Sequence, residues 1–507
     1  MKKFSVQSVG TATILILSIN VINRLIGLFK EILLAKSFGI TEVMDAFVFA
    51  QIIPFQLMSL LIGGLSIAFI PIFIEKKEKI DEKESILFSN ALLFRLLILG
   101  ILITFILYLL SPYITKIFSP NLPSDVVSLR VNILRILTST VTLIFLIGLL
   151  SAIYKSYKHF IIPSLSTLIL NISIVTFILL FSKRLSIFAP TLGIVFGLIL
   201  QFLFLSFPLI KRGFFVFNPV HEDINRLFIF SLPVIFGNNI VILNMLIDKF
   251  FASYLSSGYL SALNYASRIV LVPYTFFALS LSGAIYPYIS THVAKKENRK
   301  GENLLKNSLR FLFLILFPSS VGLIVLANPI VSLIFQRGMF DVKAVNITSS
   351  SLIFYSIGLP FFGGIVVLLR YFFSEKDSNS PLKAGILSVV VNIILNLILM
   401  RFMGHNGISL STSISSAFMF GFLYYYLKKN FNISFSSKDY TYLVKIFLSS
   451  LIMGIFTWSS FKFLPFSKTI SFIFSLMFSP IVYYIALTVL RVEERNVLLK
   501  KLMRYKL

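Results

Sequence analysis

The chain has 507 residues, of which 57% are hydrophobic and only 13% are charged, and its mean hydropathy is +0.92. A soluble domain carries roughly a quarter charged residues, so this composition excludes an ordinary soluble protein and predicts a chain that crosses a bilayer many times. There is no Cys, which excludes disulfides and thiol chemistry, and the four His residues lack metal-ligand spacing.

The formal net charge of +26 can be explained by a nucleic-acid partner or by membrane topology. In membrane proteins Lys and Arg gather in cytoplasmic loops and hold the orientation of the chain. The apolar composition favours topology, so no nucleic-acid partner is expected.

Apolar segments of about 20 residues or more follow one another along the whole chain. They predict an all-α polytopic membrane protein with about 14 transmembrane helices. Loops on the side of Met1 hold roughly three times as many Lys and Arg as the others, which predicts that both termini are cytoplasmic. The predicted spans are 9–36, 43–74, 87–112, 128–154, 159–182, 186–210, 223–253, 259–290, 306–328, 344–373, 381–402, 407–427, 441–462 and 469–490.

An internal repeat relates the first two helices to the seventh and eighth. "AFVFAQIIPFQLMSLLIGGLSIAFIP" and "ALNYASRIVLVPYTFFALSLSGAIYP" begin at Ala46 and Ala262 and end at Pro71 and Pro287. Chance alignment of apolar sequence is the alternative. A genuine repeat predicts two pseudo-repeated six-helix lobes around a central cavity, as in many secondary transporters. The expected domains are residues 1–215 (N-lobe), 216–430 (C-lobe) and 431–507 (two further helices and a basic cytoplasmic tail).

Seven charged residues lie inside these two helix pairs. A charge at the bilayer centre costs about 2.5–3.5 kcal/mol on insertion scales, so such residues are expected to face a protein interior or water and to mark a substrate or ion path. The seven are Arg24, Lys30, Glu31, Asp45, Asp248, Lys249 and Arg268.

The two arginines lie deepest, on equivalent helices of the repeat, and we expect both to bind an anionic group. The planar guanidinium suits phosphate because it can donate two hydrogen bonds to it. Glu31 and Asp248 are either part of an ion path or structural counter-ions to Lys and Arg. Asn392 and Asn396, one helical turn apart, are expected to form hydrogen bonds between helices.

Several stretches resemble one transporter family. "NRLIGLFKEILLAKSFGITEVMDAF" is similar to the first-helix signature of the MurJ/MviN lipid II flippases, and "YASRIVLVPYTFFALSLSGAIYP" to their eighth-helix signature. "FFSEKDSNSPLKAGILSVVVNIILNL" resembles the segment that joins helices 10 and 11, and "GHNGISLSTSISS" resembles helix 12. The match is spread over the first 430 residues.

This resemblance implies a member of the multidrug/oligosaccharidyl-lipid/polysaccharide exporter superfamily that moves lipid II outward across the bacterial cytoplasmic (inner) membrane by alternating access. It implies that Arg24, Lys30 and Arg268 line a cationic cavity for the diphosphate head group. Asp45 would lie near a periplasmic gate, and the last two helices would form a groove for the polyprenyl tail. Glu31, Asp248 and Lys249 would serve gating or charge pairing.

The second helix departs from the family pattern. Met58 and Ser59 stand at positions where the family has arginines, and Gly63 where it has glutamate. A flippase for another polyprenyl-diphosphate-linked saccharide is therefore an alternative to a lipid II flippase. A second alternative is a cation-coupled multidrug exporter of the same superfamily, because most of the seven charges in the two helix pairs are acidic or paired with acids.

No catalytic constellation is recognisable, so we expect a transporter rather than an enzyme, with neither a cofactor nor a structural metal. The membrane potential, or a coupling ion of unknown identity near Glu31, Asp45 or Asp248, would reset the cycle. The expected partners are the lipid-linked saccharide and membrane lipid, and the expected oligomeric state is a monomer.

Overall fold

The computed structural model describes residues 9–118, 123–217, 221–238, 240–464 and 467–492, and these ranges form helices joined by short connections, with no strands. The chain divides into two compact units. Unit 1 comprises residues 1–239, 249–261 and 335–344, and unit 2 comprises residues 240–248, 262–334 and 345–507. The predicted domain boundaries stay a prediction.

Unit 1 contains nine helices in its long N-terminal segment within the described ranges. They are α1 (Val9–Phe38), α2 (Glu42–Ala50), α3 (Met58–Lys79), α4 (Glu82–Phe118), α5 (Ser124–Thr138), α6 (Thr140–Ser156), α7 (Ile161–Leu185), α8 (Phe188–Ile210) and α9 (Asp223–Asn238).

Unit 2 contains the remaining helices in whole or in large part. They are α10 (Ile240–Ala252), α11 (Tyr259–Pro273), α12 (Ser280–Ala294), α13 (Asn298–Val325), α14 (Ala327–Phe335), α15 (Val342–Ile357), α16 (Leu359–Ser374), α17 (Asn379–Met403), α18 (His405–Phe431), α19 (Ser437–Phe463) and α20 (Lys468–Val489). The boundaries between the units fall at the start of α10, within α10, α11 and α15, and at the last residue of α14.

The helices confirm the predicted fold class and most of the span count. Among the described residues, 11 helices are long and apolar enough to cross a membrane, and a twelfth span arises if α15 and α16, bent by 42°, count as one. These twelve correspond to twelve of the predicted spans. The other two predicted spans, 9–36 and 223–253, fall on α1 and on α9 with α10, so a total of fourteen is compatible with the structure.

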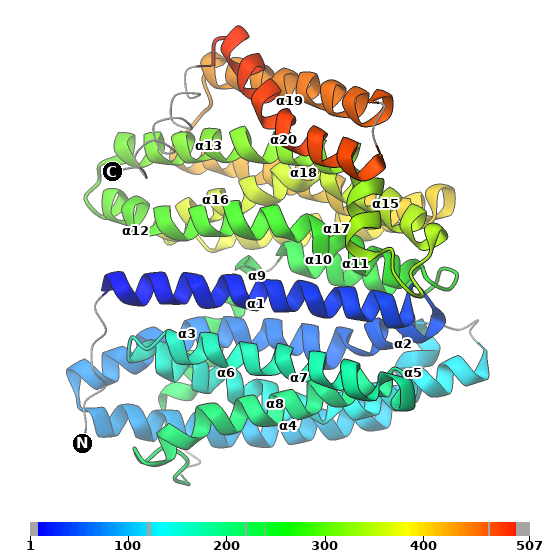
Figure 1. Cartoon of the computed structure of the whole chain (residues 1–507). Helices are drawn as coiled ribbons and strands as arrows, with labels where there is room; N and C mark the ends of the chain where they lie inside the picture. Colours follow the sequence, from blue (N-terminus) through cyan, green and yellow to red (C-terminus); the bar gives the residue numbers. More distant parts are fainter. Residues whose placement is uncertain (1–8, 119–122, 218–220, 239, 465–466, 493–507) are drawn as a thin grey trace. The chain divides into compact units, whose positions relative to one another are not determined.

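Small residues let neighbouring helices approach closely. Figure 1 shows α7 and α8 side by side, and their contact is built on Gly193 and Gly197, one helical turn apart on α8. A Cβ at Gly193 would lie 3.0 Å from the Cα of Ile174, and one at Gly197 would lie 3.2 Å from the Cα of Leu170. A larger side chain would therefore push the two backbones apart, which is why membrane helices place small residues at such contacts.

One π-helical turn interrupts the second helix of each repeat. The first (η1, Ile52–Leu57) surrounds Pro54, and the second (η2, Tyr274–Leu279) begins directly after Pro273. Proline lacks the N–H that an α-helix needs, so the backbone widens locally to re-pair its carbonyl groups. Both helices continue beyond the turn, as α3 and α12.

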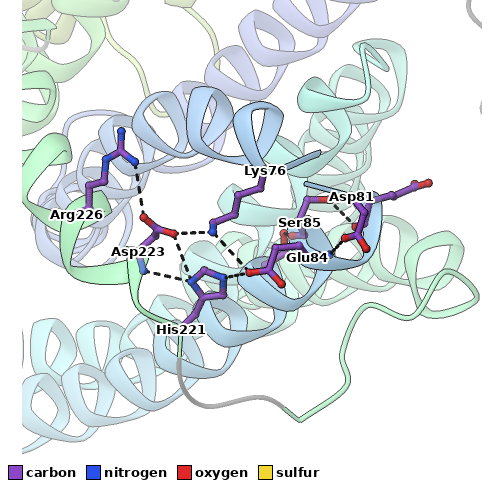
Figure 2. A network of polar contacts seen from close by, with 9 residues as sticks. Lys76, Asp81, Glu84, Ser85, His221, Asp223 and Arg226 are labelled. Carbon is purple, nitrogen blue, oxygen red and sulfur yellow. Dashed lines mark hydrogen bonds and ion pairs between the residues drawn. The ribbon is translucent and has the colours of Figure 1, made fainter. Parts of the chain in front are cut away.

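A polar network holds the start of α9 against α3 and α4 (Figure 2). The Lys76 Nζ lies 2.6 Å from Asp223 Oδ2 and 3.7 Å from Glu84 Oε1, and His221 Nε2 lies 3.0 Å from the same Glu84 oxygen. The backbone N–H of Asp223 donates to His221 Nδ1, so Nε2 carries the imidazole proton and donates to Glu84. These contacts anchor the segment that leads out of unit 1.

Candidate functional site

The charges of α1 lie on a single long helix whose midpoint is close to Arg24. At 1.5 Å per residue the 30-residue helix is about 45 Å long, so Arg24 lies near the bilayer centre if the helix crosses directly. Its side chain is exposed. Lys30 and Glu31 form an ion pair with Nζ and Oε1 3.5 Å apart, and the glutamate is buried.

Arg268 is the one exposed residue in a buried stretch of α11. Residues 260–267 and 269–270 are all buried, whereas the side chain at position 268 is open. It lies about 14 Å along the helix from Tyr259, a depth within the hydrocarbon of a typical bilayer. A charged group at that depth is expected to face protein or water rather than lipid.

Asp45 fastens the start of α2 to the start of α11, within unit 1. Its buried carboxylate accepts hydrogen bonds from the backbone N–H of Gly258 (2.6 Å), the N–H of Ser261 (2.7 Å) and the Ser261 hydroxyl (2.5 Å). Asp45 also lies in the first turn of α2, where the helix dipole favours a negative charge. The residues joined are more than 200 positions apart in the sequence.

Three glycines allow backbones to cross at this junction. Gly39, Gly258 and Gly338 have φ of +56°, +92° and +57°, values that disfavour residues with a Cβ. A Cβ on each would collide with a carbonyl oxygen, that of Met339, Ile40 and Lys36 respectively. The N–H of Met339 also donates to the Lys36 carbonyl at 3.0 Å. Three segments of unit 1, residues 36–45, 253–261 and 335–344, thus meet in direct backbone contact.

Asp248 is fully buried in unit 2 inside a cluster of polar side chains. Its carboxylate accepts hydrogen bonds from the hydroxyl of Thr412, from Asn396 Nδ2 (3.1 Å), from Asn392 Nδ2 (3.3 Å) and from the Tyr355 hydroxyl (3.1 Å). Asn396 Nδ2 also donates to Asn392 Oδ1 at 3.1 Å. Four helices, α10, α15, α17 and α18, contribute to the cluster.

The cluster contains a carboxylate, two amides and a hydroxyl, whose oxygen atoms are the kind of ligand that a hard monovalent or divalent cation prefers. Both amides present Nδ2 to the carboxylate in this structure, so they would have to turn their oxygens toward a bound cation. The buried Oδ1 of Asn396 has no hydrogen-bond partner among the described residues. A cation would satisfy this oxygen and neutralise the buried carboxylate. No group of three or more His, Asp or Glu that could hold a metal ion occurs in the described ranges.

Lys249, the last of the seven predicted charges, forms a hydrogen bond with Gln56. Its Nζ donates to Oε1 of Gln56, a residue of the first π-helical turn, at 2.9 Å within unit 1. Lys30 and Glu31 form an ion pair, which is one of the two alternatives given for Glu31, and Asn392 and Asn396 form the expected hydrogen bonds between helices. The binding and gating roles of the seven charges stay predictions.

Several residues of these sites had no part in the prediction. Tyr355 and Thr412 complete the Asp248 cluster, and Thr412 lies in the "GHNGISLSTSISS" stretch, whose run of hydroxyl residues inside a span was a usable signal. Arg130 is buried on α5, with its guanidinium carbon 5.0 Å from the centre of the Phe49 ring, and interacts electrostatically with Asp45. The signal that could have identified Arg130 is its charge near the start of the predicted span 128–154.

Comparisons with known proteins agree on one family. A family model described as "Lipid II flippase MurJ" matches residues 34–478. A probable lipid II flippase MurJ of Buchnera aphidicola subsp. Schizaphis graminum is 30% identical over 97% of both chains. The lipid II flippase MurJ of Thermosipho africanus is 31% identical over 85% of this chain and 86% of the relative.

Solved structures give the same assignment. A structure titled "Lipid II flippase MurJ, inward closed conformation" has a TM-score of 0.83 and 27% identity, and covers 96% of this chain and 100% of its own. An inward-facing multidrug resistance MATE family transporter has a TM-score of 0.69 at 15% identity over 83% of this chain and 98% of its own, which shows a common fold only. The chain is therefore a multi-pass membrane protein that belongs to the MurJ lipid II flippase family.

Proposed function

We propose that this protein moves lipid II across the bacterial cytoplasmic membrane, from the cytoplasmic to the periplasmic leaflet, by alternating access. The family match along residues 34–478 carries the proposal. It is supported by two arginines, Arg24 and Arg268, whose side chains are exposed and which both fall within predicted spans.

In this proposal Arg24, Lys30 and Arg268 bind the diphosphate and sugar head group. Guanidinium groups in a water-filled cavity inside the membrane attract an anionic head group and repel cationic cargo. Glu31 pairs with Lys30 and limits the positive charge of an empty cavity. The polyprenyl tail stays in lipid, in a groove formed by α19 and α20, while the head group crosses.

The Asp45 junction is our proposed periplasmic gate. The three bonds from Gly258 and Ser261 to one buried carboxylate are specific, yet they join only a few residues, so they can break and re-form during a transport cycle. Lys249, which donates a hydrogen bond to Gln56 in the first π-helical turn, is the proposed second contact of the gating region.

Asp248 is the proposed site of a coupling ion. Binding of a cation to Asp248, Asn392, Asn396 and Thr412 would neutralise the carboxylate and tie α10 to α17 and α18. The unfolding midpoint of the purified protein should then rise with one particular alkali-metal cation. Asp248→Asn should abolish that rise, whereas Asp125→Asn, at an exposed site, should leave it intact. Equal responses of all three proteins would exclude the ion site.

The cargo has one specific alternative, another polyprenyl-diphosphate-linked saccharide. Ser59 and Gly63 are exposed on α3 where the family has an arginine and a glutamate, and Met58 is buried at the other arginine position. In this alternative the proposed diphosphate ligands Arg24, Lys30 and Arg268 are kept, and the changed second-helix residues favour a different saccharide.

The proposed topology has both termini in the cytoplasm, an N-lobe of residues 1–215, a C-lobe of residues 216–430, and a C-terminal pair of helices with a basic tail. The proposed functional unit is a monomer. Neither an enzymatic step nor a cofactor forms part of the proposal.

Purified protein reconstituted in vesicles tests the function. Labelled lipid II, a polyprenyl-diphosphate carrier with different sugars, and a lipophilic drug cation are supplied in parallel. The proposal predicts that lipid II reaches the opposite leaflet chemically unchanged and faster than the other two. Movement of the drug cation alone would support a multidrug exporter, and a chemically altered lipid would indicate an enzyme.

A further inference from the structure

A cavity of about 340 Å³ opens in unit 2 where α13, α19 and the end of α20 meet. This volume is at the small end of the range of ligand pockets, about 300–1,000 Å³. Of the eight residues that line it in the described ranges, four are cationic and none is acidic. They are Arg310, Ser437, Lys438, Thr441, Tyr442, Lys445, Arg491 and Val492.

One face of α19 supplies most of the lining. Lys438, Thr441, Tyr442 and Lys445 recur at the three- and four-residue spacing of a single helical face. The helix begins with a capping box, in which the N–H and hydroxyl of Ser436 donate to Asp439 Oδ2 at 2.7 and 2.8 Å. The cap fixes where the helix starts and therefore which side chains face the cavity.

Arg310 is held rigidly in the opposite wall. Its Nε and one terminal nitrogen donate to Asp439 Oδ1 at 3.0 and 2.8 Å, and its guanidinium carbon lies 5.2 Å from the centre of the Tyr442 ring. The Tyr442 hydroxyl donates to the Arg310 carbonyl at 3.1 Å. A preorganised cation of this kind loses little entropy when it binds an anion.

The end of α20 places Arg491 at the cavity in an unusual conformation. The N–H of Val492 donates to the Leu487 carbonyl (2.9 Å) and that of Arg491 to the Thr488 carbonyl (3.1 Å), which is a Schellman motif. Val492 and Leu487 are buried in one apolar core, as this motif requires. Arg491, directly before Val492, has φ of +52°, and glycine is the usual residue at this position of the motif. An arginine there is strained, and strained residues cluster at functional sites.

From these observations we propose that the cavity binds the phosphodiester head group of an anionic membrane phospholipid. Among the described residues, four cations with one structural carboxylate between them leave an excess of positive charge that a phosphate would neutralise. The cavity lies at the ends of two membrane-spanning helices, on the cytoplasmic side in the proposed topology, where basic pockets between helices bind lipid head groups. A head group bound there would contact α13, α19 and α20 together and hold the C-terminal helix pair in place.

Lipid binding to the purified full-length protein tests this proposal, by native mass spectrometry and by the unfolding midpoint in detergent. Phosphatidylglycerol is compared with phosphatidylcholine, inorganic phosphate and glycerol 3-phosphate. The proposal predicts binding and a raised midpoint with phosphatidylglycerol and no comparable effect of the other three. An equal effect of inorganic phosphate or glycerol 3-phosphate would overturn the assignment to a lipid, and so would an equal effect of phosphatidylcholine.

The variant Arg491→Gly tests lipid binding without destabilising the fold. Glycine suits the φ of position 491, so without added lipid the variant should be as stable as the unmodified protein or more stable. Its affinity for phosphatidylglycerol should nevertheless fall about fivefold, the effect of one cation near a membrane surface. The bond from Lys445 Nζ to the carbonyl of residue 491, 3.4 Å long, does not involve the removed side chain.

A triple variant should bind phosphatidylglycerol roughly 100-fold more weakly, because the three contributions multiply. It combines Lys438→Gln, Lys445→Gln and Arg491→Gln. The matched control replaces three exposed lysines of unit 2 outside the cavity, Lys295, Lys428 and Lys429, by Gln. It removes the same charge and should bind within about twofold of the unmodified protein. Equal affinities of the cavity variant and the control would overturn the proposal, and the result does not depend on transport.

Discussion

Replacing Asp45 by Asn should loosen the junction between α2 and the start of α11. An amide has one acceptor oxygen where the carboxylate has two, so the variant can satisfy the donors of Ser261 or that of Gly258, not both. The amide NH₂ would then oppose a backbone N–H. The change in shape is minimal, so the effect reports on hydrogen bonding and charge.

The expected magnitude follows from the bond that is lost. A hydrogen bond from Gly258 to a charged acceptor, 2.6 Å long and buried, contributes about 1.5–3 kcal/mol. The opening equilibrium of the segment should shift by roughly 10- to 150-fold, since 1.4 kcal/mol corresponds to a factor of ten.

Amide hydrogen exchange of the peptide 253–261 measures this opening directly. Asp45→Asn should accelerate exchange at Gly258 by the factor above. Glu42→Gln is the matched control, because Glu42 is exposed in the same helical turn and also interacts electrostatically with Arg130. Exchange in Asp45→Asn that stays within twofold of the unmodified protein would refute the fastening role of Asp45.

Three further predictions concern stability in detergent. Asp377→Ala should cost about 1–2 kcal/mol, because Asp377 caps the first turn of α17. Burial alone would raise the pKa of Asp377, but hydrogen bonds from α17 and the end of α18 lower it below the ordinary 3.8. Its stabilisation is therefore present at neutral pH and disappears as the pH falls through the lowered pKa, where variant and unmodified protein should converge. Lys76→Met should cost about 1.5–3 kcal/mol, and combining it with Asp223→Asn should cost less than the sum of the two, whereas additive losses would exclude coupling. Gly338→Ala should cost more than Gly213→Ala, since both have positive φ but only the first would collide with a carbonyl; equal unfolding midpoints would contradict this.

The fold was predictable because hydropathy is a local property of the sequence. Each predicted span falls on one long helix or on a pair of shorter ones, and the π-helical turns at Pro54 and Pro273 lie where proline removes a backbone donor. The short helix α14 was not anticipated, because nine residues are too few to resemble a span.

The candidate sites were predictable only where their residues carry a local signal. Asn392 and Asn396 lie one helical turn apart in an apolar segment, and their bonding to a neighbouring helix followed from that spacing. The partners of Asp45 left no such trace, because backbone N–H groups occur in almost every residue and those of Gly258 and Ser261 are remote in the sequence. A pairing of this kind is set by tertiary structure alone.

The central claim is that Arg24 and Arg268 bind the diphosphate of lipid II during transport. Arg24→Ala and Arg268→Ala, made singly, should each abolish rescue of cells depleted of their own lipid II flippase, at unchanged levels of protein in the membrane. Arg184→Ala and Arg299→Ala, at exposed positions of the two units, should rescue normally. Normal rescue by both Arg24→Ala and Arg268→Ala would contradict the account.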